Sequence, residues 1–149
     1  MTTYNSSKGL NTVLWTAQIF LAIVFFVTGA GKLILPMEKL YEIIPWTKTV
    51  SSLPIRLIGF TEIIGSIGLI LPSLLRIKPW LTPWAATGVA FTMLLAIVFN
   101  ISFGETSVIG LNFILFLIAI FIAWGRFNRS PIPPKYPVHR VYRHSLDKN

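Results

Sequence analysis

The chain has 149 residues, of which 54% are hydrophobic and only 12% are charged. Soluble domains carry roughly 25% charged residues, so this composition excludes an ordinary water-soluble protein. The charges are also unevenly placed, because none occurs at positions 9–31, 79–104 or 106–125. Each of these gaps is long enough for a membrane-crossing helix of about 20 residues.

A fourth apolar stretch, positions 57–75, contains a single charged residue, Glu62. We therefore predict an all-α fold, an integral membrane four-helix bundle formed by residues 1–126. The transmembrane spans are expected near residues 12–35, 55–73, 83–102 and 108–125. The prolines are assigned to the connections and to the C-terminal part, so the helices between them should be long and unbroken.

Two alternatives to this interpretation fit the sequence less well. A soluble bundle requires a polar face that recurs every 3.6 residues, and the sequence at 111–124 has none. A cleaved signal peptide would explain Lys8, the apolar run after it and the small residues at 28–31. The apolar run continues past Lys32 to Leu35, however, which favours a retained first helix.

Lys and Arg residues predict the orientation of the bundle. Nine of them fall on one side of four antiparallel spans, and four, Lys32, Lys39, Lys48 and Arg56, fall on the other. Because the basic side is retained in the cytoplasm, both termini should be cytoplasmic, in a multi-pass protein of a bacterial-type inner (plasma) membrane. Residues 127–149 form a basic, Pro-rich cytoplasmic tail, whose charge fits anionic membrane lipid better than nucleic acid.

The residues that most enzyme mechanisms require are missing from this sequence. The chain has no cysteine, no histidine within a span, no glycine-rich phosphate loop and no nucleophile elbow. His139 and His144 lie in the tail without neighbouring metal-ligand types. We therefore predict no catalytic residue and no metal ligand, and the chain is not expected to be an enzyme by itself.

Polar residues inside the spans are the candidate functional positions, because they are costly in lipid. On the first helix, Gln18, Thr28 and Lys32 share one face at 100° per residue. On the second, Glu62 shares its side with Gly59 and Gly65, where small residues let a neighbouring helix approach. Lys32 and Glu62 should therefore face each other within about 4 Å.

Asn100, Glu105 and Asn112 come at the end of the third span and the start of the fourth, on the same membrane side as Lys32. They are expected to join Lys32 and Glu62 in one polar cluster. In a structural interpretation, Lys32 reaches the headgroups and the asparagines cap helix ends. In a functional one, the cluster binds the head of a lipophilic molecule, whose apolar part contacts Phe25, Phe60, Met93 and Phe113.

The connection at 37–53 is too short and too charged to cross the membrane. Met37, Leu40, Tyr41 and Ile44 give it one apolar side, next to Glu38, Lys39 and Glu42. We expect this segment to lie along the outer membrane surface.

Three motifs resemble the DoxX-like family of small membrane proteins. They are "GAGKL" at 29–33, "GFTEIIGSIGLILP" at 59–72, and "WGR" at 124–126 together with an Asn near the start of the last helix. Within the first two, Gly29, Gly59, Gly65 and Gly68 are assigned to helix packing.

The resemblance implies a four-helix bundle and, for some members, a membrane subunit of a quinone-linked sulfur oxidoreductase. Other members look like assembly factors for membrane proteins, so the family does not fix one function. Three hypotheses remain open. The chain is a non-catalytic protein that binds a lipid, a partner membrane protein or a second copy of itself; an oxidoreductase subunit that contacts quinone as cofactor; or a small transporter.

Overall fold

The fold consists entirely of helical elements and their connections. The computed structural model describes residues 8–135, and no strand occurs among them. The elements in chain order are α1 (Lys8–Ile34), α2 (Met37–Ile43), the 3-10 helix η1 (Pro45–Thr49), α3 (Ser52–Leu75), α4 (Leu81–Ser102), α5 (Ile109–Trp124) and the π-helix η2 (Gly125–Arg129).

Four long helices confirm the predicted number of membrane spans. In the described part of the chain, α1, α3, α4 and the continuous α5–η2 helix are apolar and contain 27, 24, 22 and 21 residues. At 1.5 Å per residue, even 21 residues extend about 32 Å, which matches a hydrocarbon core of about 30 Å.

The outer surface of these helices is largely apolar. Phe20, Phe26, Leu94 and Phe113 are each about half exposed, and many other aliphatic side chains face outward in the same way. A soluble monomer rarely exposes so large an apolar surface. The surface and the helix lengths together make this a multi-pass membrane protein.

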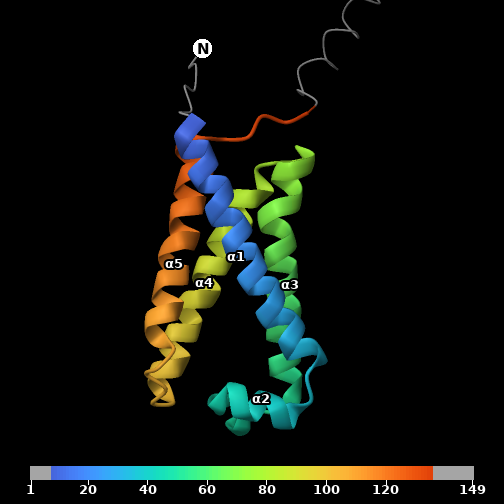
Figure 1. Cartoon of the computed structure of the whole chain (residues 1–149), viewed down its shortest axis with the longest axis vertical. Coiled ribbons are helices and arrows are strands. Elements are labelled where there is room, and N and C mark those ends of the chain that lie inside the picture. Colours follow the sequence, from blue (N-terminus) through green and yellow to red (C-terminus); the bar gives the residue numbers. More distant parts are fainter. Residues whose placement is uncertain (1–7, 136–149) are drawn as a thin grey trace, which may run out of the picture.

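The helices associate as neighbouring pairs. α1 packs on α3, α4 packs on α5, and α3 packs on α4 (Figure 1). Their shared core is built from aliphatic, aromatic and small side chains, including Leu21, Phe25, Leu69, Ala86, Val89, Ala90, Met93, Leu115, Ala119 and Ile122. The small alanines let α4 and α5 approach closely without a polar contact.

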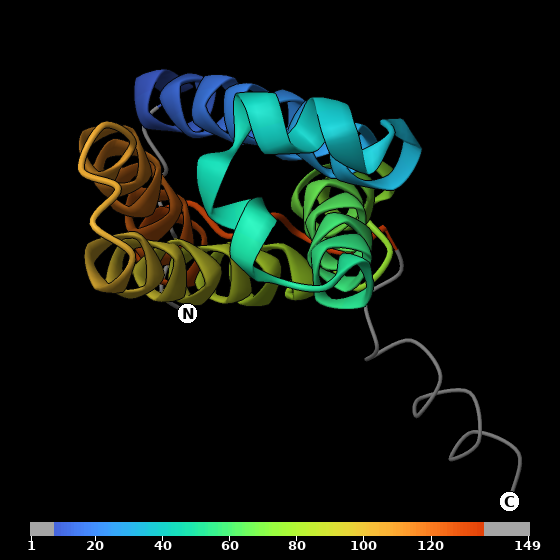
Figure 2. The ribbon, with the colours of Figure 1, turned by 90° about the horizontal axis from the view of Figure 1, so that it is seen from below.

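The bundle has two ends of different character. Lys8, Arg76 and Lys135 lie at one end, which we name the Arg126 end, and α1 finishes with Lys32 at the opposite Lys32 end (Figure 1). At the Lys32 end the α1–α3 pair diverges from the α4–α5 pair (Figure 1). The segment with α2 and η1 lies across that end (Figures 1 and 2).

The α2–η1 segment does not form a span, as predicted. Leu40 and Thr47 are buried against the bundle, whereas Glu38 and Lys39 are exposed. The Trp46 ring packs edge-on against Phe99 of α4 at 5.1 Å between centroids. The apolar side predicted for this segment therefore turns toward the protein, and its charged side turns outward.

The prediction that the prolines lie outside the spans is wrong for Pro72, although the helices are long and unbroken as expected. Pro72 lies inside α3, near its end, and the helix stops only at Arg76, which has a left-handed φ of 55°. Pro54 and Pro83 each occupy the first turn of a helix, where the backbone N–H would have no intrahelical partner. Pro72 removes one backbone hydrogen bond of α3. Because it lies in the last turn, the rest of the helix is unaffected and continues to Leu75.

The chain after α5 folds back over the Arg126 end. η2 extends the last helix to Arg129, beyond the expected end of the membrane domain at 126. The backbone N–H of Lys135 then donates to the carbonyl of Arg76 at 3.0 Å, which places residues 130–135 beside the α3–α4 connection. The rest of the predicted tail, with His139 and His144, lies outside the described residues.

The predicted orientation is testable because the chain contains no cysteine. Thr49 and Ile77 are exposed at opposite ends of the bundle. If both termini are cytoplasmic, Thr49→Cys reacts with a membrane-impermeant maleimide in intact cells. Ile77→Cys reacts only after the cells are permeabilised. Labelling of Ile77→Cys in intact cells, with Thr49→Cys protected, would reverse the orientation.

Candidate functional site

The close contact between α1 and α3 depends on two glycines that face each other. A Cβ atom on Gly29 would lie 2.8 Å from the carbonyl oxygen of Gly59, and one on Gly59 would lie 2.9 Å from that of Gly29. Real Cβ atoms do not approach backbone oxygen this closely. Without side chains at both positions, the two backbones touch, which is the packing predicted for them.

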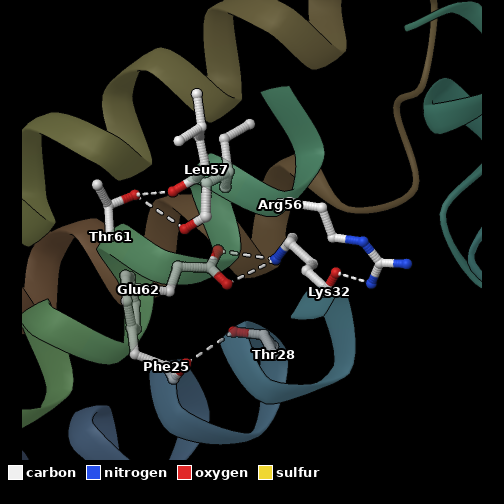
Figure 3. Close-up of polar contacts among 8 residues, drawn as sticks. Phe25, Thr28, Lys32, Arg56, Leu57, Thr61 and Glu62 are labelled. Atoms are coloured by element: carbon white, nitrogen blue, oxygen red, sulfur yellow. Dashed lines mark hydrogen bonds and ion pairs between the residues drawn. The ribbon is translucent and has the colours of Figure 1, made fainter. Parts of the chain in front are cut away.

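This contact brings Lys32 and Glu62 together as an ion pair. The Lys32 ammonium donates to both carboxylate oxygens, at 2.8 Å to Oε1 and 2.7 Å to Oε2 (Figure 3). The two side chains are only 9% and 7% exposed. The sequence prediction that they approach within about 4 Å is confirmed. Lys32 therefore turns to α3 and does not extend toward the headgroups.

Arg56 fixes the end of α1 beside this pair. Its Nη1 donates to the carbonyl of Lys32 (Figure 3). Its Nη2 donates to the carbonyl of Leu35 at 2.9 Å. The last carbonyls of a helix have no intrahelical partner and attract a cation. Arg56 was not predicted as a site residue, although its place at the start of an antiparallel neighbour was a usable signal.

Glu62 also borders an apolar groove between α3 and α4. The groove has a volume of about 430 Å³ and contains Thr61, Glu62, Gly65 and Gly68 of α3 opposite Ala85 and Gly88 of α4, among others. Gly88 faces open space, whereas Gly65 and Gly68 let α3 contact Val89 and Ala85 of α4. Glu62 is the one ionisable group in the wall of the groove.

The predicted apolar lining is partly wrong. Phe25 borders the groove and is buried. Met93 is buried in the core but does not border the groove, whereas Phe60 and Phe113 are 55% and 51% exposed on the outer surface. Helical spacing fixes the direction in which a side chain leaves its own helix. Whether that side chain is buried depends on where the neighbouring helix lies, which the spacing does not give.

Other predicted members of the polar cluster do not reach the ion pair. Thr28 donates to the carbonyl of Phe25 in its own helix, and buried Asn100 donates to that of Ala96 at 2.8 Å. Glu105 bonds the carbonyl of Asn100 through its backbone N–H, and Asn112 likewise bonds Val108. Thr28 lies one turn from Lys32 on α1, but its hydroxyl bonds its own helix. Asn100, Glu105 and Asn112 belong to the α4–α5 pair, which diverges from α1 and α3 at this end, so they share an end of the bundle with Lys32 but do not bond it.

Gln18 belongs to a second polar cluster at the opposite end. It is fully buried, and its Nε2 donates to the carbonyl of Leu69 at 2.7 Å. Its Oε1 accepts a hydrogen bond of 2.6 Å from Nε of Arg126, and Arg126 Nη1 donates to Asn11 Oδ1 at 2.7 Å. Gln18 lies on the same face of α1 as Lys32, as predicted, but about 21 Å from it along the helix.

Gly125 allows Arg126 to enter this second cluster. A Cβ atom at position 125 would lie 2.5 Å from Leu14 Cδ2, so η2 and α1 are in direct contact there. The sequence indicated Arg126 as part of the "WGR" motif and as one of the charges that set the orientation, but not as a site residue. Its position two residues after an apolar run, next to a glycine, was the signal that it could turn inward.

The arrangement combines a neutralised ion pair with an apolar groove. The Lys32 ammonium and the Glu62 carboxylate neutralise each other, and Glu62 keeps acceptor capacity beside the groove. Within residues 8–135, no group of three or more histidine, acidic or cysteine side chains could hold a metal ion. Glu62 can therefore accept a hydrogen bond from a polar group that enters this otherwise apolar groove.

The comparisons with known proteins identify the family. The sequence profile of the DoxX-like family matches residues 16–122. The chain belongs to this family. The DoxX-like match includes the facing glycines, the Lys32–Glu62 pair and the whole groove, but it stops before Arg126. No curated protein and no solved structure matches the chain.

The ion pair predicts non-additive mutational effects. Glu62→Gln leaves the Lys32 ammonium buried without its counter-charge, and we expect a loss of about 3 kcal/mol of stability. The double variant Lys32→Met with Glu62→Gln should be more stable than Glu62→Gln alone. Thermal unfolding in detergent measures both, with Glu42→Gln as the control for an exposed carboxylate. Additive losses would show that the two charges do not act as a unit.

The glycine contact predicts a position-dependent cost of alanine. Gly59→Ala places a Cβ 2.8 Å from Lys32 Cβ and 2.9 Å from a backbone oxygen, so α1 and α3 must separate. We expect this to cost about 1–3 kcal/mol. Gly110→Ala, whose Cβ would meet no atom within 4 Å, is the matched control and should be neutral or stabilising. Equal unfolding temperatures for the two variants would contradict the contact.

Proposed function

We propose that this DoxX-like protein binds a lipophilic molecule in the α3–α4 groove, with the polar head of that molecule at Glu62. The protein carries out no reaction by itself and resides in a bacterial-type inner membrane. The observation that supports this proposal most directly is that Glu62 pairs with Lys32 and also borders the groove.

The size and lining of the groove suit one amphiphilic molecule. Its volume of about 430 Å³ falls within the range of 300–1,000 Å³ that is common for small-molecule sites. Ile64, Trp84 and Val89 give it apolar walls that match an acyl or isoprenoid chain. The groove lies between two helices whose other faces are apolar, so such a molecule would enter sideways from the bilayer.

The ion pair favours a neutral, hydrogen-bonding head. Lys32 already compensates the charge of Glu62, so a second full charge in this apolar environment would have no partner. A hydroxyl or amide N–H can donate to a free lone pair of the carboxylate at little electrostatic cost. Lipids with a hydroxyl-bearing head and reduced quinones both fit this description.

The second candidate function is that of an oxidoreductase subunit, because a quinone would also fit the groove. The Glu62 carboxylate would hold the quinone head, and a partner protein would supply the flavin, haem or thiol, because this chain has no cysteine. The supporting observation is the same groove together with the family membership. Co-purification of such a redox subunit would favour this candidate over a lipid-binding protein.

A helix from a partner protein or a second copy could fill the groove as well. Gly65, Gly68 and Gly88 form a small-residue surface of the kind that transmembrane helices pack against. A small transporter has the least support, because α1, α3 and α4 are continuous helices and the ion pair is a single one.

Filling the groove tests the proposal. Gly88→Leu adds a side chain where a Cβ would meet no atom within 4 Å, so the fold should tolerate it while the groove is blocked. We expect Gly88→Leu to lose at least tenfold of the co-purifying lipid or quinone measured by native mass spectrometry. Gly110→Leu is the matched control, because it is equally open but lies on α5 outside the groove. Equal retention by both variants would refute binding at this place.

A further inference from the structure

We propose a second binding site, at the Arg126 end, for the phosphate group of an anionic phospholipid. The site is a cavity between the α3–α4 connection, η2 and the returning chain after it. Its volume is about 430 Å³, and its walls include Lys78, Trp80, Arg126, Phe127, Ile132 and Pro134. Two cations thus border a cavity that is otherwise apolar, which is the pattern for an anionic head joined to hydrocarbon.

Arg126 is buried with part of its hydrogen-bonding capacity unused. It is 3% exposed, and its Nε and Nη1 donate to Gln18, Asn11 and the carbonyl of Ser130. The guanidinium has five N–H donors, and these three bonds account for those on Nε and Nη1. Nη2 is buried and has no hydrogen-bond partner among the described residues. A buried donor without a partner is costly, so a ligand that bonds Nη2 would be stabilised.

Arg126 also lacks a counter-charge within residues 8–135. Its hydrogen-bond partners are an amide, a second amide and a carbonyl, all neutral, and the Trp15 ring lies 5.4 Å from Cζ. The acidic residues in this part of the chain, Glu38, Glu42, Glu62 and Glu105, occupy elements at or toward the Lys32 end. A buried cation surrounded by neutral groups favours an anion from outside the described structure.

Within residues 8–135, the surroundings of this cavity add positive charge and no negative charge. Lys78 borders the same cavity, and Arg76 and Arg129 lie on the two segments that form it. A phosphate offers two oxygens that match the fork of a guanidinium, and a lysine can neutralise it as a point charge. A phosphodiester carries one negative charge, so it can bond the guanidinium of Arg126 and lie beside the ammonium of Lys78. Phosphodiesters are also the anionic groups that a bilayer supplies at the level of its headgroups.

The apolar walls favour a phospholipid over free phosphate. Trp80 is 57% exposed and Phe127 is 44% exposed, so both continue from the cavity onto the outer surface of the bundle. Acyl chains can follow this surface while the phosphate stays at Arg126 and Lys78. The predicted orientation places this end at the cytoplasmic leaflet, where anionic lipids are enriched.

This site is separate from the groove of the proposed function. The groove requires a neutral head at Glu62, whereas the cavity at the opposite end requires an anion at Arg126. The two wall sets share no residue. Variants of one site should therefore leave the ligand of the other in place, so either proposal can fail alone.

The test is a lipid titration of the full-length, delipidated protein in detergent. Short-chain phosphatidylglycerol, phosphatidylcholine of equal chain length, and inorganic phosphate are added separately, and bound ligand is measured by native mass spectrometry. Lys78→Gln is the first variant, because Lys78 is exposed and its loss should not affect folding. Arg126→Lys keeps the charge but removes the fork. Lys8→Gln, which removes an exposed lysine of the same end outside the cavity, is the control.

We expect the wild-type chain to bind phosphatidylglycerol about tenfold more tightly than phosphatidylcholine, whose choline cation opposes Lys78. Lys78→Gln should weaken phosphatidylglycerol binding about tenfold, the loss typical of one charged hydrogen bond, and Lys8→Gln should leave it unchanged. Equal binding of the two lipids, or equal losses in Lys78→Gln and Lys8→Gln, would overturn the proposal. Binding of inorganic phosphate as tight as phosphatidylglycerol would replace the lipid with a free anion and so would overturn it as well.

Discussion

The backbone contact of α1 with α3 is the constraint on which the Lys32–Glu62 site depends. Gly29 and Gly59 meet with no room for a Cβ atom on either, and the ion pair begins three residues further along each helix. A lysine and a glutamate can bridge only a limited gap with both carboxylate oxygens engaged. The glycines set that gap, and Arg56 prevents the end of α1 from moving away. The absence of a side chain at two positions thus makes a buried charge pair tolerable in lipid.

Polar groups concentrate near the two ends of the bundle, and the same two helices contribute to both concentrations. α1 supplies Lys32 at one end and Gln18 at the other, while α3 supplies Glu62 and the carbonyl of Leu69. Between them lie apolar residues such as Leu21 and Phe25. In a bilayer, apolar packing between helices gains little over packing against lipid, so directional contacts fix the helix positions. Directional contacts of this kind join α1 to α3 near both ends of the bundle.

Features that depend on composition or on a single helix could be predicted from the sequence. Gaps between charges predicted the four spans, and helical angles predicted that Lys32 and Glu62 face inward. The second cluster was missed because Arg126 and Gln18 are 108 residues apart, and their contact depends on how α1 crosses η2. Asn100 was wrongly expected at the ion pair. Its position along the chain predicted its depth in the membrane, but depth does not specify the lateral position of its helix.

The groove exists because α4 takes no part in these directional contacts with α1. Among the described residues, one side-chain hydrogen bond joins α4 to α3, from Ser73 to Thr82 at 2.7 Å near the Arg126 end. Beyond it, the two helices meet through Gly68 against Ala85 and Gly65 against Val89. Small residues on a glycine-rich face permit contact at these points and leave space between them. Glu62 borders that space, so the ion pair that holds α1 against α3 also includes the one ionisable residue in the wall of the groove.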